Sequence, residues 1–180
     1  MDEKQDLLDM TYEELSEAFS RMGFQSFRAK QVYNWLYSGQ LNFDEMTNLP
    51  KEMRSTLSEK FVAGGLKIAN KLVSKIDGTR KYLFELRDGN IIESVLMKYR
   101  YGYSACLSTQ VGCRMGCTFC ASAPLGLVRN LTVGEMLGQL LSIAHDIGDR
   151  ISHVVLMGIG EPFDNYDNVM TFLRRINRED

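Results

Sequence analysis

Three cysteines stand close together in the segment GCRMGCTFC, at Cys113, Cys117 and Cys120. Three residues separate the first two and two residues separate the last two, and Gly112 and Gly116 favour a loop. Thiolate sulfur suits zinc and iron–sulfur clusters, and a cubane cluster held by three protein cysteines keeps one iron open to another molecule. An open iron is a catalytic feature, so the spacing predicts a catalytic iron–sulfur site.

Two other uses of these cysteines compete with the cluster. A structural zinc site needs a fourth ligand, for which His145 or His153 could serve, although neither stands at finger-like spacing. A thioredoxin-type redox pair would use Cys117 and Cys120 at the start of a helix and would leave Cys113 idle. We favour the cluster because it uses all three thiols.

A glycine-rich segment, GIGEP, occupies residues 158–162 and follows the apolar run at 154–157. Glycine at the carboxyl end of a strand lets the backbone approach a ligand, and the Glu161 carboxylate can accept hydrogen bonds from an ammonium group. Taken alone, such a segment is more often an ordinary turn than a cofactor site. Its place, one strand and one helix after the cysteines, makes it a candidate.

Together the two segments resemble the radical S-adenosylmethionine family. The cysteine order, with Phe119 as the aromatic residue before the last cysteine, is similar to that family's signature, and GIGEP is similar to its glycine-glutamate-proline element. The resemblance implies that the open iron of a [4Fe-4S] cluster binds S-adenosylmethionine and delivers the electron that releases a deoxyadenosyl radical. It also implies that Cys113, Cys117 and Cys120 ligate the cluster. Gly160 and Glu161 would hold the amino group of the cofactor.

The sequence around these two segments is similar to that of the RlmN type of dual-specificity RNA methyltransferase. The likeness covers nearly the whole chain and is carried by FRAKQVYNWLY, ESVLM, YGYSACLSTQVGCRMGCTFCAS, GLVRNLT and MGIGEPFDN. It implies methylation of carbon 2 of an adenine in 23S rRNA and in some tRNAs, with an electron donor such as flavodoxin or ferredoxin. A sister group methylates carbon 8 and usually lacks the proline after the glutamate, so Pro162 favours carbon 2.

Two further residues take roles from this resemblance. In the family, a cysteine near the carboxyl end is methylated, loses a hydrogen atom to the radical and couples to the adenine, and we expect it beyond these 180 residues. Cys106 matches the second catalytic cysteine, which releases the product by forming a disulfide with the first. Glu93 matches the proton acceptor. From the residues alone, Cys106 could be a small buried strand residue and Glu93 a solvent-facing one. Which of them takes the proton stays open.

The elements that position these residues can be read from the periodicity of apolar side chains. Thr11 and Glu14 form a capping box, and Gly23 ends the first helix. A second helix should end near Gly39, and a third should run from Pro50 to about Val62. Residues 1–65 therefore form a predicted helical accessory domain, which we expect to bind RNA.

The pattern then changes to strands. The predicted strands 67–76, 81–86 and 91–97 form an antiparallel meander within a linking domain at residues 66–103. Strand, loop and helix then occur twice, which is typical of an α/β fold with a parallel sheet. The predicted elements are a strand at 104–108, the cysteine loop, a helix at 133–147 capped by Thr132, a buried strand at 154–157 and a helix at 168–176.

Residues 104–180 are thus interpreted as the first two βα units of a partial TIM-like radical S-adenosylmethionine barrel. Two parallel strands cannot close a barrel, so we expect a truncated core that is inactive by itself. A different radical enzyme that shares only the cluster loop is one rival function. An RNA-binding, metal-containing fragment without activity is another.

The composition of the chain limits the kinds of partner that it can have. The chain has 180 residues and a net charge of −2, with 44% hydrophobic and 24% charged residues. No apolar run nears the roughly 18 residues that span a bilayer, and the acidic start is unlike a signal peptide. We therefore expect a cytoplasmic protein without a membrane segment.

The positive charge is concentrated at residues 21–81, which carry eleven Lys and Arg against five Asp and Glu. Such a segment can bind phosphates, although a solvated lysine-rich surface explains it equally well. The candidate RNA contacts are Arg28, Lys30, Lys51 and Arg54 in the helical unit and Lys71, Lys75 and Arg80 in the meander.

Overall fold

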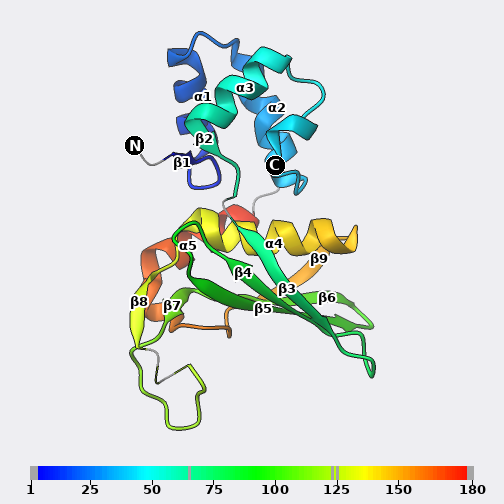
Figure 1. Ribbon diagram of the computed structural model, residues 1–180, viewed down its shortest axis with the longest axis vertical. Helices are drawn as coiled ribbons and strands as arrows, with labels where there is room; N and C mark the ends of the chain where they lie inside the picture. Colours follow the sequence, from blue (N-terminus) through cyan, green and yellow to red (C-terminus); the bar gives the residue numbers. More distant parts are fainter. Residues whose placement is uncertain (1–3, 65, 123, 125, 178–180) are drawn as a thin grey trace.

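The computed structural model describes residues 4–64, 66–122, 124 and 126–177. It has two parts, a helical unit and a mixed α/β unit built around a five-stranded sheet. Figure 1 shows helices α4 and α5 lying between the helical unit and the sheet.

The helical unit contains α1 (Tyr12–Arg21), α2 (Ser26–Tyr37) and α3 (Lys51–Lys60), with a short 3-10 turn, η1 (Phe43–Glu45), between the last two. The predicted capping box is present, because the Thr11 hydroxyl accepts from the Glu14 N–H and the Glu14 carboxylate accepts from the Thr11 N–H. The apolar faces of the helices meet in a core whose fully buried side chains include Leu15, Phe19, Leu36 and Leu57.

The third helix ends earlier than predicted. The helix stops at Lys60, and Phe61–Val62 forms the short strand β2, which pairs in parallel with β1 (Gln5–Asp6). Phe61 has extended backbone angles, and the Leu7 N–H donates to the Val62 carbonyl at 2.9 Å. The prediction failed because the partner strand lies far away in the sequence and is only two residues long.

The sheet has the order β3–β4–β5–β6–β9. The strands β3, β4 and β5 form the predicted antiparallel meander, and β6, which was predicted only as the first strand of the parallel part, also pairs antiparallel with β5, while β9 is parallel to β6. Because β6 pairs with both β5 and β9, the meander and the parallel pair form one continuous sheet. The bounds are β3 Lys67–Val73, β4 Arg80–Glu85, β5 Ile91–Tyr99, β6 Gly102–Cys106 and β9 Ile151–Val155.

One face of this sheet is covered by α4 (Val133–Ile147) and α5 (Tyr166–Ile176). Thr132 and Glu135 form a second capping box at the start of α4, and Gly148 ends the helix in the left-handed conformation. The bounds of α4 agree with those predicted, and α5 starts at Tyr166, two residues before its predicted start. Tyr82, Phe84, Ile92, Leu96 and Ala105 are buried on the covered face, together with apolar residues of α4.

The last strand differs from its prediction. The expected strand at 154–157 was buried, whereas β9 starts at Ile151 and is mostly exposed. In the described part of the chain, β9 pairs only with β6 and is therefore an edge strand. Val155 is 36% exposed, and Met157, just beyond the strand, is 81% exposed.

A hairpin that was not predicted frames the cysteine loop. It consists of β7 (Gln110–Gly112) and β8 (Leu127–Asn130), which pair in an antiparallel manner. Gly112 has a φ of +71°, and a Cβ there would overlap the carbonyl oxygen of Gly126. The glycine is therefore needed for the two ends of the loop to come together.

Hydrogen bonds from the sheet unit to the segment at Leu8 and Asp9 help to join the units. The Asp9 carboxylate accepts from the Gly134 N–H, in the first turn of α4, at 2.6 Å. The Arg175 guanidinium of α5 donates to the carbonyls of Leu8 and Asp9 at 2.6 and 2.8 Å. None of the described helices has the length and apolar character needed to span a membrane.

Candidate active site

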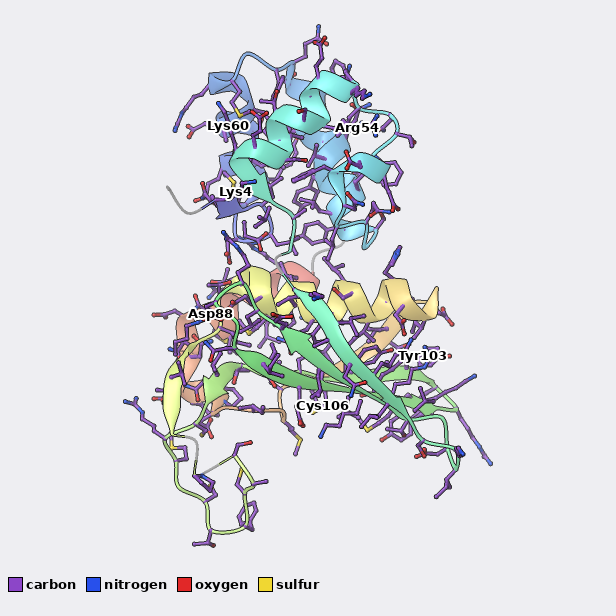
Figure 2. All side chains as sticks on the ribbon, in the orientation of Figure 1. Lys4, Arg54, Lys60, Asp88, Tyr103 and Cys106 are labelled. Carbon is purple, nitrogen blue, oxygen red and sulfur yellow. The ribbon has the colours of Figure 1, made fainter. Side chains whose placement is uncertain are left out.

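Glu93 and Cys106 lie on the same face of the sheet, which we call the open face. Cys106 pairs with Val95 of β5, and paired residues of neighbouring strands point to the same side. Glu93 is two residues from Val95 and therefore shares that side. Ala105, beside Cys106 in the strand, is fully buried and points to the helices, so Cys106 points away from them (Figure 2).

The two side chains differ in their surroundings. Cys106 is a free, half-buried thiol, and burial raises its pKa above the ordinary value. The thiol is consequently protonated at neutral pH. Glu93 pairs with Lys81 across the strands, with 2.7 Å between Oε1 and Nζ, and its side chain is 40% exposed. Solvent or a ligand can thus reach the Glu93 carboxyl group.

The three cysteines of the predicted cluster lie in the loop between β7 and β8. All are free thiols, and Cys117 and Cys120 are exposed. The Cys113 N–H donates to the Gly126 carbonyl at 2.9 Å, and the Cys120 N–H donates to the Cys117 carbonyl at 3.1 Å. Across the described ranges, no three His, Cys, Asp or Glu side chains are close enough to hold a metal ion. The structure therefore places the thiols in one loop without bringing them together.

The donor chemistry nevertheless fits a metal cluster. Three soft sulfur ligands lie on a short loop whose two ends are paired in β7 and β8. Gly116, in the left-handed conformation, turns the backbone between the first two of these cysteines. His153 packs edge-on against the Tyr101 ring at 4.8 Å, and His145 lies in the last turn of α4. Neither histidine forms a metal-ligand group with the cysteines among the described residues.

The glycine-rich segment lies against the end of β6. The Gly158 N–H donates to the Leu107 carbonyl at 3.0 Å, and the Thr109 N–H donates to the Ile159 carbonyl at 2.9 Å. Gly160 has a φ of +108°, and a Cβ there would come within 2.6 Å of the Gln110 Cβ. Both the backbone angle and the lack of space require glycine at this position.

Glu161 is held at both its backbone and its side chain. Its N–H donates to the Gln110 Oε1 at 2.9 Å, and its own Oε1 accepts from the Phe163 N–H at 3.0 Å. A carboxylate has more lone pairs than this one bond uses, so Glu161 can still accept from an ammonium group. The structure thus brings Gly160 and Glu161 beside Gln110, which precedes the cysteine loop.

Sequence reasoning missed several buried polar residues around these segments. The Gln139 side chain of α4 accepts from the Ser94 hydroxyl and the Ser108 N–H and donates to the Ser108 carbonyl. The Asn165 side chain donates to the carbonyls of Thr109 and Leu131, both at 2.8 Å. The signal that could have found them is the polar run at 108–110, which is buried although it directly continues an apolar strand.

Arg129, which follows the cysteine loop, connects three segments. Its guanidinium binds Glu135 through two hydrogen bonds of 2.8 Å and Asp88 through one of 2.7 Å. This contact lowers the pKa of the Asp88 carboxyl to about 2. A polar cavity of about 620 Å³ opens beside these residues, also lined by Lys4 and Asp9. No predicted site residue lines this cavity. The candidate site is therefore defined by the chemistry of its side chains and not by the cavity.

The candidate RNA contacts fall into two groups. Lys30, Lys51 and Lys75 are exposed. The other four bind within the protein: Arg54 donates to the Asp44 carbonyl and Arg28 to the Asn48 carbonyl, while Lys71 and Arg80 pair with Asp146.

Comparisons with known proteins identify relatives of both units. Residues 5–63 match the family described as the ribosomal RNA large subunit methyltransferase N-terminal domain. Over 98% of its length, the chain is 55% identical to the probable dual-specificity RNA methyltransferase RlmN of Alkaliphilus oremlandii. A protein of the same name from Clostridium perfringens is 53% identical over 96% of the chain.

A solved structure is also similar. The chain matches the crystal structure of a radical SAM methyltransferase from Sphaerobacter thermophilus with a TM-score of 0.91 and 38% identity over 97% of its length. The chain covers 52% of that structure, and it spans about half the length of the curated relatives.

Proposed function

The chain belongs to the RlmN family and corresponds to its amino-terminal portion, and from that premise we propose that it forms part of a radical S-adenosylmethionine enzyme that methylates carbon 2 of adenine. The substrates are 23S rRNA and tRNA, and the methyl group passes through a cysteine outside these 180 residues. An external donor such as flavodoxin or ferredoxin supplies electrons.

One observation carries this proposal: the candidate cofactor segments both follow the carboxyl ends of the parallel strands β6 and β9. The cysteine loop follows β6, and the turn with Gly160 and Glu161 follows β9. Ligands of parallel α/β folds bind at this edge. Cys106 is the last residue of β6 and thus lies at the same edge.

The residues divide the chemistry between them. Cys113, Cys117 and Cys120 would hold a [4Fe-4S] cluster, which supplies the electron for radical chemistry on S-adenosylmethionine. Glu161 would accept hydrogen bonds from the amino group of that cofactor, and Gly160 leaves room for it.

The proton assignment follows from the two environments on the open face. Burial raises the pKa of the Cys106 thiol and so further disfavours the thiolate, the form that could accept a proton. Glu93 forms an ion pair with Lys81 and its side chain is accessible, so we assign it as the proton acceptor. Cys106 would act later: it loses its thiol proton and its sulfur bonds to that of the methyl-carrying cysteine, while the bond between that sulfur and the carbon attached to the RNA breaks and this carbon takes up a proton to become the methyl group.

The architecture has matching roles. We propose that residues 1–65 form the RNA-binding accessory domain, that residues 66–103 link it to the core, and that residues 104–180 form the first two βα units of a partial TIM-like barrel. The β6–α4–β9–α5 order supports the last assignment. The open face would then line the interior of the barrel.

The test uses the full-length protein that contains this chain. Anaerobically reconstituted enzyme is incubated with S-adenosylmethionine, a reductant and either a 23S rRNA fragment or tRNA, and the modified nucleoside is identified by mass spectrometry against synthetic standards. We expect 2-methyladenosine. Formation of 8-methyladenosine would assign the chain to the sister activity, and an RNA complex without any methylation would leave only a binding role.

A further inference from the structure

A chain of polar contacts connects the cysteine loop to the glycine-glutamate turn. The Arg114 guanidinium, between the first two cysteines, forms an ion pair with Asp164, three residues after Glu161. The other carboxylate oxygen of Asp164 accepts from the Gln110 Nε2 at 3.2 Å. The Gln110 Oε1 in turn accepts from the Glu161 N–H at 2.9 Å. Two segments that lie about 50 residues apart are thereby joined through three side chains.

The burial of these side chains makes the connection specific. Gln110 is fully buried and the Asp164 side chain is only 12% exposed, whereas the Arg114 side chain is 64% exposed. Gln110 also donates to the Asn130 Oδ1 at 2.7 Å, so its amide orientation is determined by three partners. A buried amide with three partners has one favourable orientation. Arg114 is the exposed member of this set of contacts, and its guanidinium is held by Asp164.

We propose that Asp164 is a positioning residue. Because it binds both Arg114 and Gln110, it holds the cysteine loop in a fixed position relative to the Gly160–Glu161 turn. This inference rests on the proposed function. The loop would hold the metal cluster and the turn would hold the amino group of S-adenosylmethionine, so one cofactor has to reach both. Asp164 does not touch either ligand in this scheme. Asp164 determines the distance between the cysteine loop and the Gly160–Glu161 turn.

A geometric argument explains why such a contact is needed. The described contacts of the loop interior are few. Residues 114–120 are exposed, and the backbone hydrogen bond from the Cys120 N–H to the Cys117 carbonyl stays within the loop. The hairpin fixes the stem of the loop, but the Arg114–Asp164 pair ties its interior to the turn. Residues outside the ligand shell that orient it commonly change affinity or activity by 10- to 100-fold.

The experiment measures binding of S-adenosylmethionine to reconstituted full-length enzyme by equilibrium dialysis. Asp164→Asn keeps the size of the side chain and one acceptor for Gln110 but removes the charge that binds Arg114. We expect binding to weaken on the order of 10-fold, with iron and sulfide content unchanged. The change in the electron paramagnetic resonance spectrum of the reduced cluster on adding S-adenosylmethionine should need correspondingly more cofactor. Asp167→Asn, on the exposed first turn of α5, is the matched control and should bind normally.

A double-mutant cycle tests whether Asp164 acts through Arg114. Arg114→Ala should weaken binding about as much as Asp164→Asn, and the double variant should be little worse than either single variant. Arg114→Lys keeps the charge and should recover most of the affinity. Additive effects of the two substitutions, or normal binding by Asp164→Asn, would overturn the inference.

The outcomes separate this inference from the proposed function. If the wild-type enzyme takes up no cluster or does not bind S-adenosylmethionine, the proposed function fails. If the wild-type enzyme does both and the Asp164 and Arg114 variants behave like Asp167→Asn, only the positioning role fails. Thermal unfolding of each apo-protein detects variants that do not fold, and for these Arg114→Lys supplies the decisive comparison because it retains the ion pair.

Discussion

The helical unit and the sheet unit bury their apolar residues in different ways. In the helical unit, the inward faces of α1, α2 and α3 enclose a common core, with Leu15, Phe19 and Leu57 almost fully buried. In the sheet unit, one face packs against α4 and α5, while the open face carries Glu93 and Cys106. The residues that stabilise the fold thus lie in the helical unit and on the covered face of the sheet. The residues proposed to react lie on the open face.

This comparison predicts that changes in the cysteine loop remove chemistry without removing stability. Cys113→Ala, Cys117→Ala and Cys120→Ala should each abolish the brown chromophore of reconstituted protein, because each removes one of the three thiolates that would hold the cluster. The Cys117→Ala and Cys120→Ala apo-proteins should unfold within about 0.5 kcal/mol of wild type, because these two positions are exposed. Cys106→Ala should retain the chromophore. Equal loss of colour in the Cys106 variant would contradict the three-ligand assignment.

Cys106 offers a second test of the open face. In the full-length enzyme, Cys106→Ala should stop turnover after coupling and trap a covalent protein–RNA adduct, because release through the disulfide is impossible. A denaturing gel after incubation with S-adenosylmethionine, reductant and RNA detects the adduct. Normal turnover without retained RNA would remove Cys106 from the mechanism.

The reverse experiment disturbs the helical unit. Leu57→Ala leaves a cavity in its core and should lower the free energy of unfolding by about 2–5 kcal/mol. Hydrogen exchange should show the loss mainly in α1, α2 and α3, with cluster content unchanged. The control, Leu72→Ala on the edge strand β3, removes a side chain that is 57% exposed and should cost within about 0.5 kcal/mol. Loss of the cluster in Leu57→Ala would show that the two units are not separable.

RNA affinity should depend on the helical unit. Lys30→Glu and Lys51→Glu change exposed lysines and should each weaken binding several-fold at low salt. Each lost phosphate contact should also reduce the slope of log affinity against log salt by about 0.7–0.9. Titration at several salt concentrations measures both effects. Lys98→Glu on β5, outside the basic segment, is the control. Affinity that is insensitive to salt would show that the basic segment is only a solvated surface.

The smallest effect is expected at the Asp88–Arg129 ion pair of the sheet unit. The folded-state pKa of Asp88 is about 2, below the ordinary 3.8, so its contribution is present above about pH 4 and is lost as the pH falls towards 2. Because the Asp88 side chain is 39% exposed, Asp88→Asn should cost less than about 1 kcal/mol at pH 7. Urea unfolding at pH 7 and pH 2.5 should show the difference shrinking. A difference that grows at low pH would contradict the assignment.

Local signals predicted much of the fold. The capping residues Thr11 and Thr132 and the glycines that follow the helices located α1, α2 and α4 within a few residues, because these contacts are made between neighbours in the sequence. Alternation predicted the meander for the same reason. The pairings β1–β2 and β7–β8 were missed because each depends on a distant partner and on strands of only two to four residues.

The site was predictable in its residue types but not in its arrangement. The spacing of the cysteines and the GIGEP segment identified candidate ligands, and the structure lays the second of these segments beside Gln110. Gln110 lies in the polar run at 108–110, but no local pattern identifies its three partners, which come from β8, the turn and η3 (Pro162–Asn165). Residues that act by bridging distant segments are invisible to periodicity.

The Arg175 contact has a consequence for biosynthesis. Arg175 binds the carbonyls of Leu8 and Asp9, 167 and 166 residues earlier in the chain. At roughly 5–20 residues per second, the ribosome makes Arg175 about 8–30 s after Asp9. The helical unit has time to fold first around its local contacts. Docking onto α4 and α5 is then the late step of maturation, and a nascent chain stalled before Arg175 should expose the 8–9 segment to protease.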